Sequence, residues 1–163
     1  MPAKTERTGQ TQEHLYTLEV FLLSGPITEA FARRNKVVSR TIEIKGDQTL
    51  ADLHEAIFDA FDRQDEHMYE FQFGKGPHDP QGKRYVLPAA MEGPFGEDDA
   101  AGIVTRTSMD SLGLKNDQAF GYWFDFGDDW FHQINVVAVS PDVPKRKYPR
   151  VTNRVGESPP QYA

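Results

Sequence analysis

The segment 125–132, which reads DFGDDWFH, gathers the side chains of this sequence best suited to chemistry. It carries Asp125, Asp128, Asp129 and His132, and carboxylates with an imidazole are the groups that divalent cations and acid–base catalysts use. Asp and Gly also tolerate the backbone of a tight turn, so the same residues fit an ordinary hairpin loop. The sequence leaves both interpretations open.

The register of the hairpin decides which residue faces His132. If Asp128 and Asp129 form a two-residue loop, Asp125 lies directly opposite His132 on the neighbouring strand. A shift of one residue removes that pairing. The sequence does not choose between these registers.

Of two further histidines, one lies within a predicted helix and the other follows it. His54 lies at the edge of its apolar face and His67 opens the strand that follows, so the two side chains could meet near the C-terminal half of the helix. A histidine on an apolar flank is also commonly a hydrogen-bonded core residue. We expect no metal and no cofactor. The candidate catalytic residues are His54, His67, Asp125 and His132, and the candidate ligands, were a metal bound, are His54, His67, Asp128 and His132.

Alternating apolar and polar residues predict the strands that would position these side chains. The pattern covers residues 15–23, 37–44 and 67–73, and RYVL at 84–87 is typical of a short strand. The runs 120–126 and 130–139 predict a C-terminal β-hairpin. Its core-facing side would carry Phe120, Tyr122, Phe124 and Phe126.

The clearest helix is predicted over residues 49–61, TLADLHEAIFDAF. Thr49 is the expected N-cap and Asp52 its capping-box partner. The apolar arc consists of Leu50, Leu53, Ile57 and Phe61. Because such a helix needs a sheet to cover it, we expect an α+β fold, a mixed β-sheet with one main amphipathic helix packed on one face. The order strand, strand, helix, strand resembles a β-grasp-like ββαβ opening.

The length of the chain fits a single α+β domain over residues 14–163, after a disordered leader at 1–13 that is charged and lacks aromatic residues. The Gly-, Pro- and acid-rich segment 74–102 predicts an excursion. Residues 144–163 predict an extended tail, either a solvated arm or a segment lying on the domain. The candidate ligand- or partner-binding residues are Trp130, Asp128, Asp129, Lys145, Arg146, Lys147 and Arg150.

Composition excludes several classes of function. With 18 basic and 25 acidic residues the net charge is −7, the wrong sign for a protein that mainly coats phosphate backbones. The absence of cysteine excludes thiolate chemistry and fits a reducing compartment, so we expect a cytoplasmic location. No signal peptide or apolar run of membrane-spanning length is present, so no membrane partner is expected. Walker A and Gly-x-Ser-x-Gly motifs are also missing.

Three stretches together carry a family resemblance: TLADLHEAIFDAF followed by HMYEF, then FDFGDDWFHQI, then YPR with GESPP. Over residues 15–163 the sequence resembles the plasmid open-reading-frame-three family, also labelled a transposon-passenger or TnpR-like family. The resemblance implies an α+β domain found on plasmids, insertion elements and chromosomes, and it carries over no catalytic residue. We therefore expect a noncatalytic binding or accessory module of a mobile element, whose partner is a protein or a nucleic acid. The alternative is a metal-assisted or acid–base enzyme that uses the His/Asp cluster.

Overall fold

The computed structural model describes residues 13–75, 79, 81–92, 96 and 99–162. Within these residues one eight-stranded sheet runs in the order β5-β4-β3-β6-β7-β1-β2-β8. Neighbouring strands are antiparallel except β4 and β5, which are parallel, so the predicted mixed sheet is confirmed. The strands are β1 (Leu15–Ser24), β2 (Ser39–Lys45), β3 (Tyr69–Phe73), β4 (Lys83–Val86), β5 (Gly102–Ile103), β6 (Ala119–Phe124), β7 (Trp130–Ser140) and β8 (Arg150–Val155).

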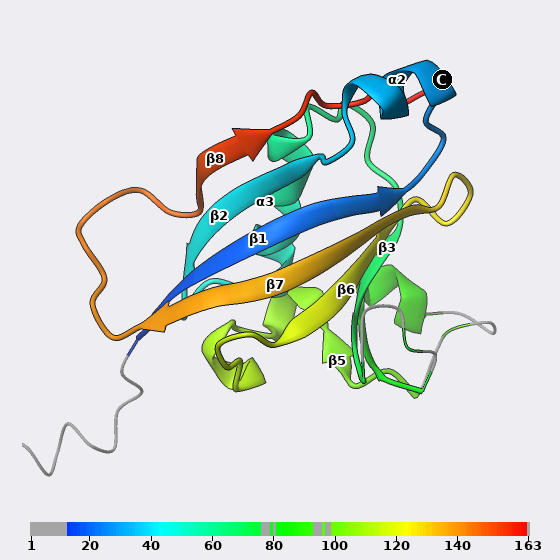
Figure 1. Ribbon diagram of the computed structural model, residues 1–163. Coiled ribbons are helices and arrows are strands. Elements are labelled where there is room, and N and C mark those ends of the chain that lie inside the picture. The colour runs from blue at the N-terminus through cyan, green and yellow to red at the C-terminus, as the bar shows by residue number, and fades with distance from the viewer. Residues whose placement is uncertain (1–12, 76–78, 80, 93–95, 97–98, 163) are drawn as a thin grey trace, which may run out of the picture.

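One main helix, α3 (Leu50–Ala60), covers one face of the sheet and lies behind it in Figure 1. The predicted capping box is confirmed, because the Thr49 hydroxyl accepts from the Asp52 backbone N–H at 3.2 Å and the Asp52 carboxylate accepts from the Thr49 N–H at 2.8 Å. All four predicted arc residues are buried in the core: Leu50, Leu53, Ile57 and Phe61. The shorter elements are α2 (Glu29–Arg34) and the 3-10 turns η1 (Pro88–Met91), η2 (Val104–Arg106) and η3 (Asp110–Leu112).

Strands β1 and β7 form the centre of the sheet and share the longest ladder. Leu18 pairs with Val136 and Val20 with Ile134, and all four side chains are buried on the helix side. The alternation of the sequence places them there, because successive side chains of a strand point to opposite faces. The core therefore lies between these strands and α3.

The hairpin register differs from both registers considered from the sequence, the two-residue loop and the register shifted from it by one residue. Phe124 pairs with Trp130, so the loop has five residues, 125–129, and Tyr122 rather than Asp125 lies opposite His132. The loop closes through the Asp129 N–H, which donates to the Asp125 carbonyl at 2.6 Å. Asp125 and Asp129 adopt positive φ angles of 67° and 59°, a conformation that Asp tolerates better than most residues. The two-residue loop, which the sequence left open, therefore does not form.

The lengthened loop also moves Phe126 away from the predicted core face. Phe120, Tyr122 and Phe124 are fully buried as expected, whereas Phe126 is 39% exposed. Strand β6 ends at Phe124, so Phe126 lies within the loop, where strand alternation no longer sets its direction.

The C-terminal segment is not a solvated arm throughout. Residues 150–155 form β8, which pairs with β2 at the edge of the sheet, and Arg150 donates to the Glu43 carboxylate at 3.0 Å. Farther on, the Gln161 side-chain carbonyl accepts from the backbone N–H groups of Gln64 and Asp65 at 2.7 and 3.0 Å. These two described parts of the segment, residues 150–155 and Gln161, therefore lie against the domain.

The remaining expectations concern the leader, the excursion, the β-grasp likeness and membrane-spanning segments. Residues 1–12 of the predicted leader lie outside the described residues, and the excursion 74–102, described only in part, contributes β4 to the sheet. The order β1, β2, α3, β3 is present, but β6 and β7 separate β3 from β1, and the β-grasp likeness stays a prediction. No helix in the described ranges is long and apolar enough to cross a membrane.

Candidate functional site

A hollow of about 540 Å³ opens between the middle of α3, the connection that follows it and the start of β3. Its ionisable side chains other than Tyr69 come from the helix and the connection, and β3 and the later segments contribute Tyr69, Leu87 and Thr105. We call this hollow the His54 pocket, and the residues that matter here are His54, Glu55, Glu66, His67, Met68 and Tyr69.

His54 is held rigidly at the wall of the pocket. Its side chain is 2% exposed and its ring stacks on Tyr69 with a centroid distance of 3.8 Å and an interplanar angle of 3°. Nδ1 lies 2.6 Å from the Tyr122 hydroxyl and Nε2 lies 2.8 Å from Glu66 Oε1. Because an ionised carboxylate can only accept, Nε2–H donates to Glu66, and Nδ1 accepts from the Tyr122 hydroxyl.

Burial controls the charge of this cluster. It lowers the pKa of His54 to about 4, with the Glu55 carboxylate opposing the shift, so the imidazole is neutral at neutral pH. Burial also raises the pKa of Glu55 and of Glu66, and it raises the pKa of Tyr122 well above its ordinary range. A neutral imidazole can therefore act as a ligand, and Tyr122 keeps its hydroxyl proton.

Three potential ligand groups converge in the pocket. One atom each of His54, Glu55 and Glu66 lies within 4.8 Å of the other two, and Glu55 Oε2 is 3.9 Å from His54 Nε2. The two glutamate side chains are 64% and 53% exposed, so both have room to move. The site thus combines one buried imidazole with two solvent-exposed carboxylates, which suits a positively charged ligand.

His67 lines the same pocket, but its ring nitrogen contacts residues outside the His54, Glu55 and Glu66 group. Strand β3 begins at Tyr69, so His67 lies in the connection and does not open the strand as the alternation predicted. Its Nε2 is 3.0 Å from the Tyr162 hydroxyl and 3.5 Å from Asp125 Oδ2. These contacts link the C-terminal segment to the hairpin loop.

Asp125 is buried, and its carboxylate forms hydrogen bonds within its own loop. Its Oδ1 accepts from the backbone N–H groups of Gly127 and Asp128 at 3.0 and 3.1 Å. Asp125 therefore contributes the turn chemistry that the sequence allowed, and its Oδ2 lies near His67, another candidate catalytic residue.

His132 is fully buried in the core and does not line the pocket. Arg63 Nη2 donates to its Nε2 at 2.8 Å, which leaves Nδ1–H to donate to the Tyr122 carbonyl at 3.2 Å. Arg63 is buried as well and lies 5.0–5.1 Å from the ring centroids of Phe61, Phe124 and Trp130. The four residues His54, His67, Asp125 and His132 therefore do not form one site.

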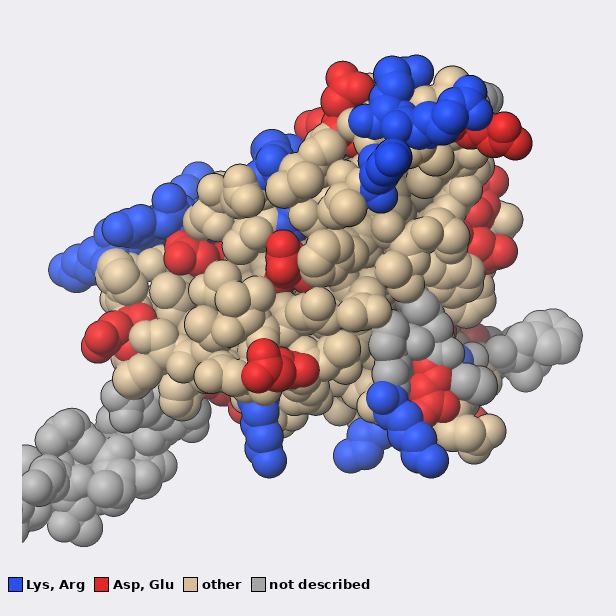
Figure 2. Space-filling view, viewed as in Figure 1, with Lys and Arg blue, Asp and Glu red and all other residues tan. Residues whose placement is uncertain are grey.

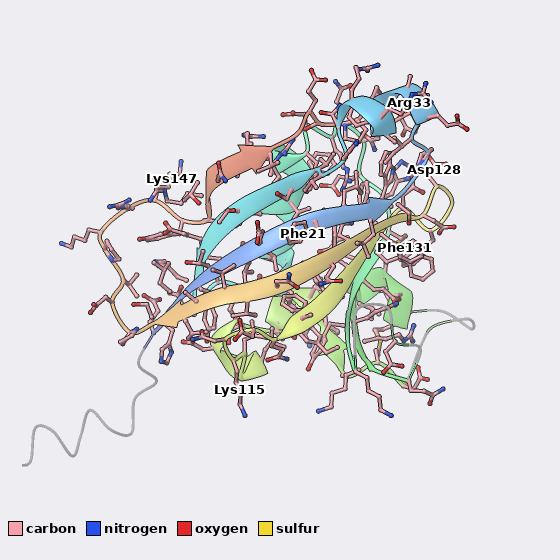
Figure 3. The ribbon with its side chains drawn as sticks, viewed as in Figure 1. Phe21, Arg33, Lys115, Asp128, Phe131 and Lys147 are labelled. Carbon is pink, nitrogen blue, oxygen red and sulfur yellow. The ribbon has the colours of Figure 1, made fainter. Side chains whose placement is uncertain are left out.

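The candidate partner-binding residues are scattered. Trp130 is fully buried with its ring against Gly25, which leaves it unavailable to a partner, whereas Asp128 is exposed in the hairpin loop (Figure 3). Asp129 accepts from the Trp123 indole N–H at 2.9 Å. The exposed residues Lys145, Arg146 and Lys147 follow β7, and Figure 2 shows basic side chains along this edge of the molecule.

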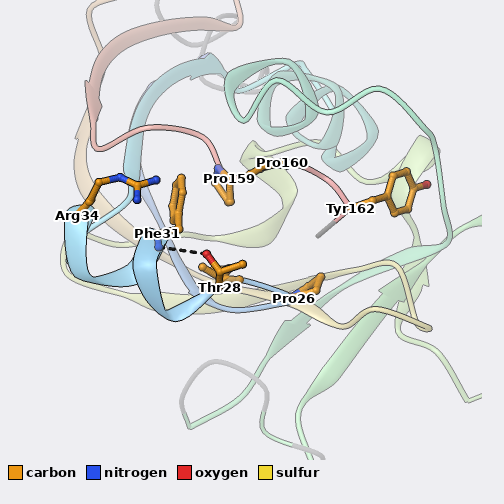
Figure 4. Close-up of a pocket in the computed structure, with 8 residues that line it drawn as sticks. Pro26, Thr28, Phe31, Arg34, Pro159, Pro160 and Tyr162 are labelled. Carbon is orange, nitrogen blue, oxygen red and sulfur yellow. Dashed lines mark hydrogen bonds between the residues drawn. The ribbon is translucent and has the colours of Figure 1, made fainter.

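Two other hollows differ from the His54 pocket. Between α2 and the C-terminal segment lies a cavity of about 210 Å³ lined by Phe31, Pro159 and Tyr162, and it is mainly apolar (Figure 4). A second hollow, beyond the C-terminal end of α3, contains Arg40 and Arg154. We call the latter the arginine cluster.

Sequence reasoning missed Glu55 and Glu66 as site residues. Glu55 falls on the polar side of the predicted helix, and Glu66 lies in a short acidic connection without periodicity, so no pattern placed it opposite His54. The adjacency of His54 and Glu55 was the only local signal.

Comparison with known proteins supports the family and the fold. A sequence profile for plasmid pRiA4b ORF-3-like proteins matches residues 30–162. The crystal structure of a protein of unknown function from Methanosarcina mazei Go1 superposes with a TM-score of 0.64 at 22% identity, over 93% of this chain and 74% of that chain. No curated protein matches the sequence. The predicted family resemblance is confirmed, and the chain belongs to the plasmid pRiA4b ORF-3-like family.

Proposed function

We propose that the protein is a noncatalytic binding module that holds a positively charged ligand in the His54 pocket. The observation that carries the proposal is the convergence of Glu55 and Glu66 on the same side of the pocket as a fixed, neutral His54. A volume of about 540 Å³ suits a small ligand or a side chain of a partner.

Charge favours a cation. The described residues that line the pocket include two carboxylates and neither lysine nor arginine. A phosphate group would be repelled by these carboxylates, whereas an ammonium, a guanidinium or a metal ion would be attracted. A basic side chain of a partner protein therefore suits the pocket better than a nucleic acid backbone does.

The noncatalytic assignment rests on how the other candidate residues are used. His132 is enclosed by Arg63 and the Tyr122 carbonyl, and Asp125 accepts from its own loop. Groups committed to such bonds are poorly placed to exchange protons with a substrate. An accessory role on a mobile element is supported by the family description, which refers to a plasmid open reading frame.

A thermal-shift panel on the full chain tests the proposal. The probes are Zn²⁺, Mn²⁺, Mg²⁺, spermidine and arginine amide, with inorganic phosphate as the anionic comparison. We expect at least one cation to raise the Tm of the wild type and of Asp59→Asn, which removes an exposed carboxylate of α3 outside the pocket, but not of Glu66→Gln. The proposal fails if no cation raises the Tm, or if Glu66→Gln responds like Asp59→Asn.

A second candidate is a metal-assisted or acid–base enzyme. It is favoured by His67, which lines the same pocket and lies 3.5 Å from Asp125, because a carboxylate beside an imidazole can orient it for proton transfer. The test is hydrolysis of p-nitrophenyl acetate, p-nitrophenyl phosphate and bis(p-nitrophenyl) phosphate. Turnover that is lost in both His67→Asn and Glu66→Gln would favour the enzyme, and turnover that neither variant changes would reject it.

A further inference from the structure

We propose that the ligand is a divalent transition-metal ion, with Zn²⁺ as the best fit, bound by His54 Nε2 and the carboxylates of Glu55 and Glu66. This inference deepens the proposed function and rests on it. It also differs from what we expected from the sequence, which was no bound metal and, were one bound, a different set of ligands.

The donor set selects the class of ion. Imidazole nitrogen suits Zn²⁺ and its neighbours in the transition series, whereas Mg²⁺ and Ca²⁺ prefer oxygen ligands alone. Three protein ligands of the His/Glu type leave a zinc ion at least one open position. That position could be occupied by water or by an oxygen of a partner molecule.

The distances require a small closure of the carboxylates. Zinc binds nitrogen and carboxylate oxygen at about 2.0–2.2 Å, so two atoms bound to one ion lie no more than about 4.4 Å apart. The three groups span up to 4.8 Å, a little beyond this limit. Glu55 and Glu66 are more than half exposed and can move, while His54 is fixed and already directs Nε2 at Glu66.

Tyr122 supplies the second-shell contact that a zinc-bound histidine needs. When a metal takes Nε2, the imidazole proton moves to Nδ1 and requires an acceptor. The Tyr122 hydroxyl oxygen lies 2.6 Å from Nδ1 and can accept a hydrogen bond from Nδ1–H once its own O–H turns to another direction, and the stacked Tyr69 ring fixes the plane of the imidazole. The histidine is therefore oriented before any ion arrives.

The ligands come from two parts of the chain. His54 and Glu55 lie on α3, whereas Glu66 lies in the connection that leads into β3. Consecutive helical residues diverge by about 100°, so His54 and Glu55 alone are poor partners, and Glu66 closes the set from outside the helix. An ion bound here would tie the connection to α3.

Isothermal titration of the untagged, metal-free full chain with ZnCl₂ tests the inference. We expect one ion per chain, an affinity about tenfold or more lower in Glu66→Gln and in His54→Gln, and an affinity within about twofold of wild type in Asp59→Asn. Binding of Mg²⁺ should be much weaker than that of Zn²⁺. Since His54→Gln alters a buried residue and could fail to fold, the exposed Glu66→Gln variant carries the decision.

The outcomes separate the two proposals. Equal zinc affinity in Glu66→Gln and Asp59→Asn, or no zinc binding by the wild type, overturns the metal site. If zinc does not bind, but spermidine or arginine amide stabilises the wild type and not Glu66→Gln, the proposed binding function stands and only the metal site is rejected. If no cation binds, both proposals fall.

Discussion

The arginine cluster and the His54 pocket both border α3, and they use their polar groups in opposite ways. At the C-terminal end of the helix, Arg40 and Arg154 both donate to the Ala60 carbonyl, at 2.8 and 2.6 Å. In the His54 pocket, by contrast, carboxylates with spare acceptor positions face solvent. A polar residue whose hydrogen bonds are all made within the fold has a structural role. Carboxylate oxygens that can still accept hydrogen bonds beside a buried imidazole indicate a ligand site instead.

Arg40 illustrates the structural case. Its side chain is almost fully buried, and besides Ala60 it donates to the carbonyls of Ser39 and Val155 at 2.6 and 3.0 Å and to the Ser158 hydroxyl at 2.8 Å. The residue thereby joins the end of α3 to β2, to β8 and to the segment after it. A cation at this position also compensates the negative end of the helix dipole.

The largest effect that would sharpen this comparison is expected from Arg40→Ala. Three carbonyls would lose a donor and packing would be lost over the Phe61 ring, so we expect about 3 kcal/mol less stability in urea unfolding. Arg154→Ala should cost about 1 kcal/mol, because Arg40 still donates to Ala60. Both variants should keep wild-type zinc affinity when folded. A loss of zinc affinity would contradict the separation of the two regions.

The next effect concerns pH. The pKa of His54 is about 4 in the folded protein against an ordinary value of 6.5, so between these values the unfolded chain binds more protons. Stability from this group is complete above pH 6.5 and is lost as the pH falls toward 4. We expect about 2 kcal/mol less stability at pH 5 than at pH 8 in urea titrations.

The matched variant for the pH experiment is His54→Gln, which retains Glu55, Glu66 and their raised pKa values. Its stability should fall less between pH 8 and pH 5 than that of the wild type. Parallel curves for the two proteins would mean that His54 is not the group responsible.

A smaller effect is expected from Tyr122→Phe, which removes the hydroxyl that would accept from Nδ1–H of zinc-bound His54 and changes the side-chain volume little. We expect zinc affinity to fall about tenfold, the usual size of a second-shell effect. Titration at constant pH measures it. Unchanged affinity in a folded variant would show that the tyrosine only fills the core.

The sequence predicted the elements whose signals are local. The capping box, the apolar arc of α3 and the buried face of β1 all follow from spacing within a few residues. Strand β8 was not foreseen, because its pairing depends on β2, more than a hundred residues earlier. The hairpin loop length was also missed, since Asp125 can end a strand or continue one according to whether its φ is positive.

The candidate site was predicted only in part, for a similar reason. His54 lies at the edge of the apolar arc, and its burial beside a site was foreseeable. Its partners were not, because Glu66 approaches through the path of the connection and Tyr122 reaches it across the core from β6. The sequence left open whether His132 joins the same pocket, and in the structure Arg63 and the Tyr122 carbonyl hold that ring inside the core.

The most direct test of the claim that the His54 pocket has spare binding capacity is anomalous diffraction from crystals grown with Zn²⁺. The account predicts a zinc peak about 2.0–2.1 Å from His54 Nε2, with the carboxylates of Glu55 and Glu66 turned toward it and no comparable peak at the arginine cluster. Zinc peaks only on other surface residues, with Nε2 still bonded to Glu66, would contradict it.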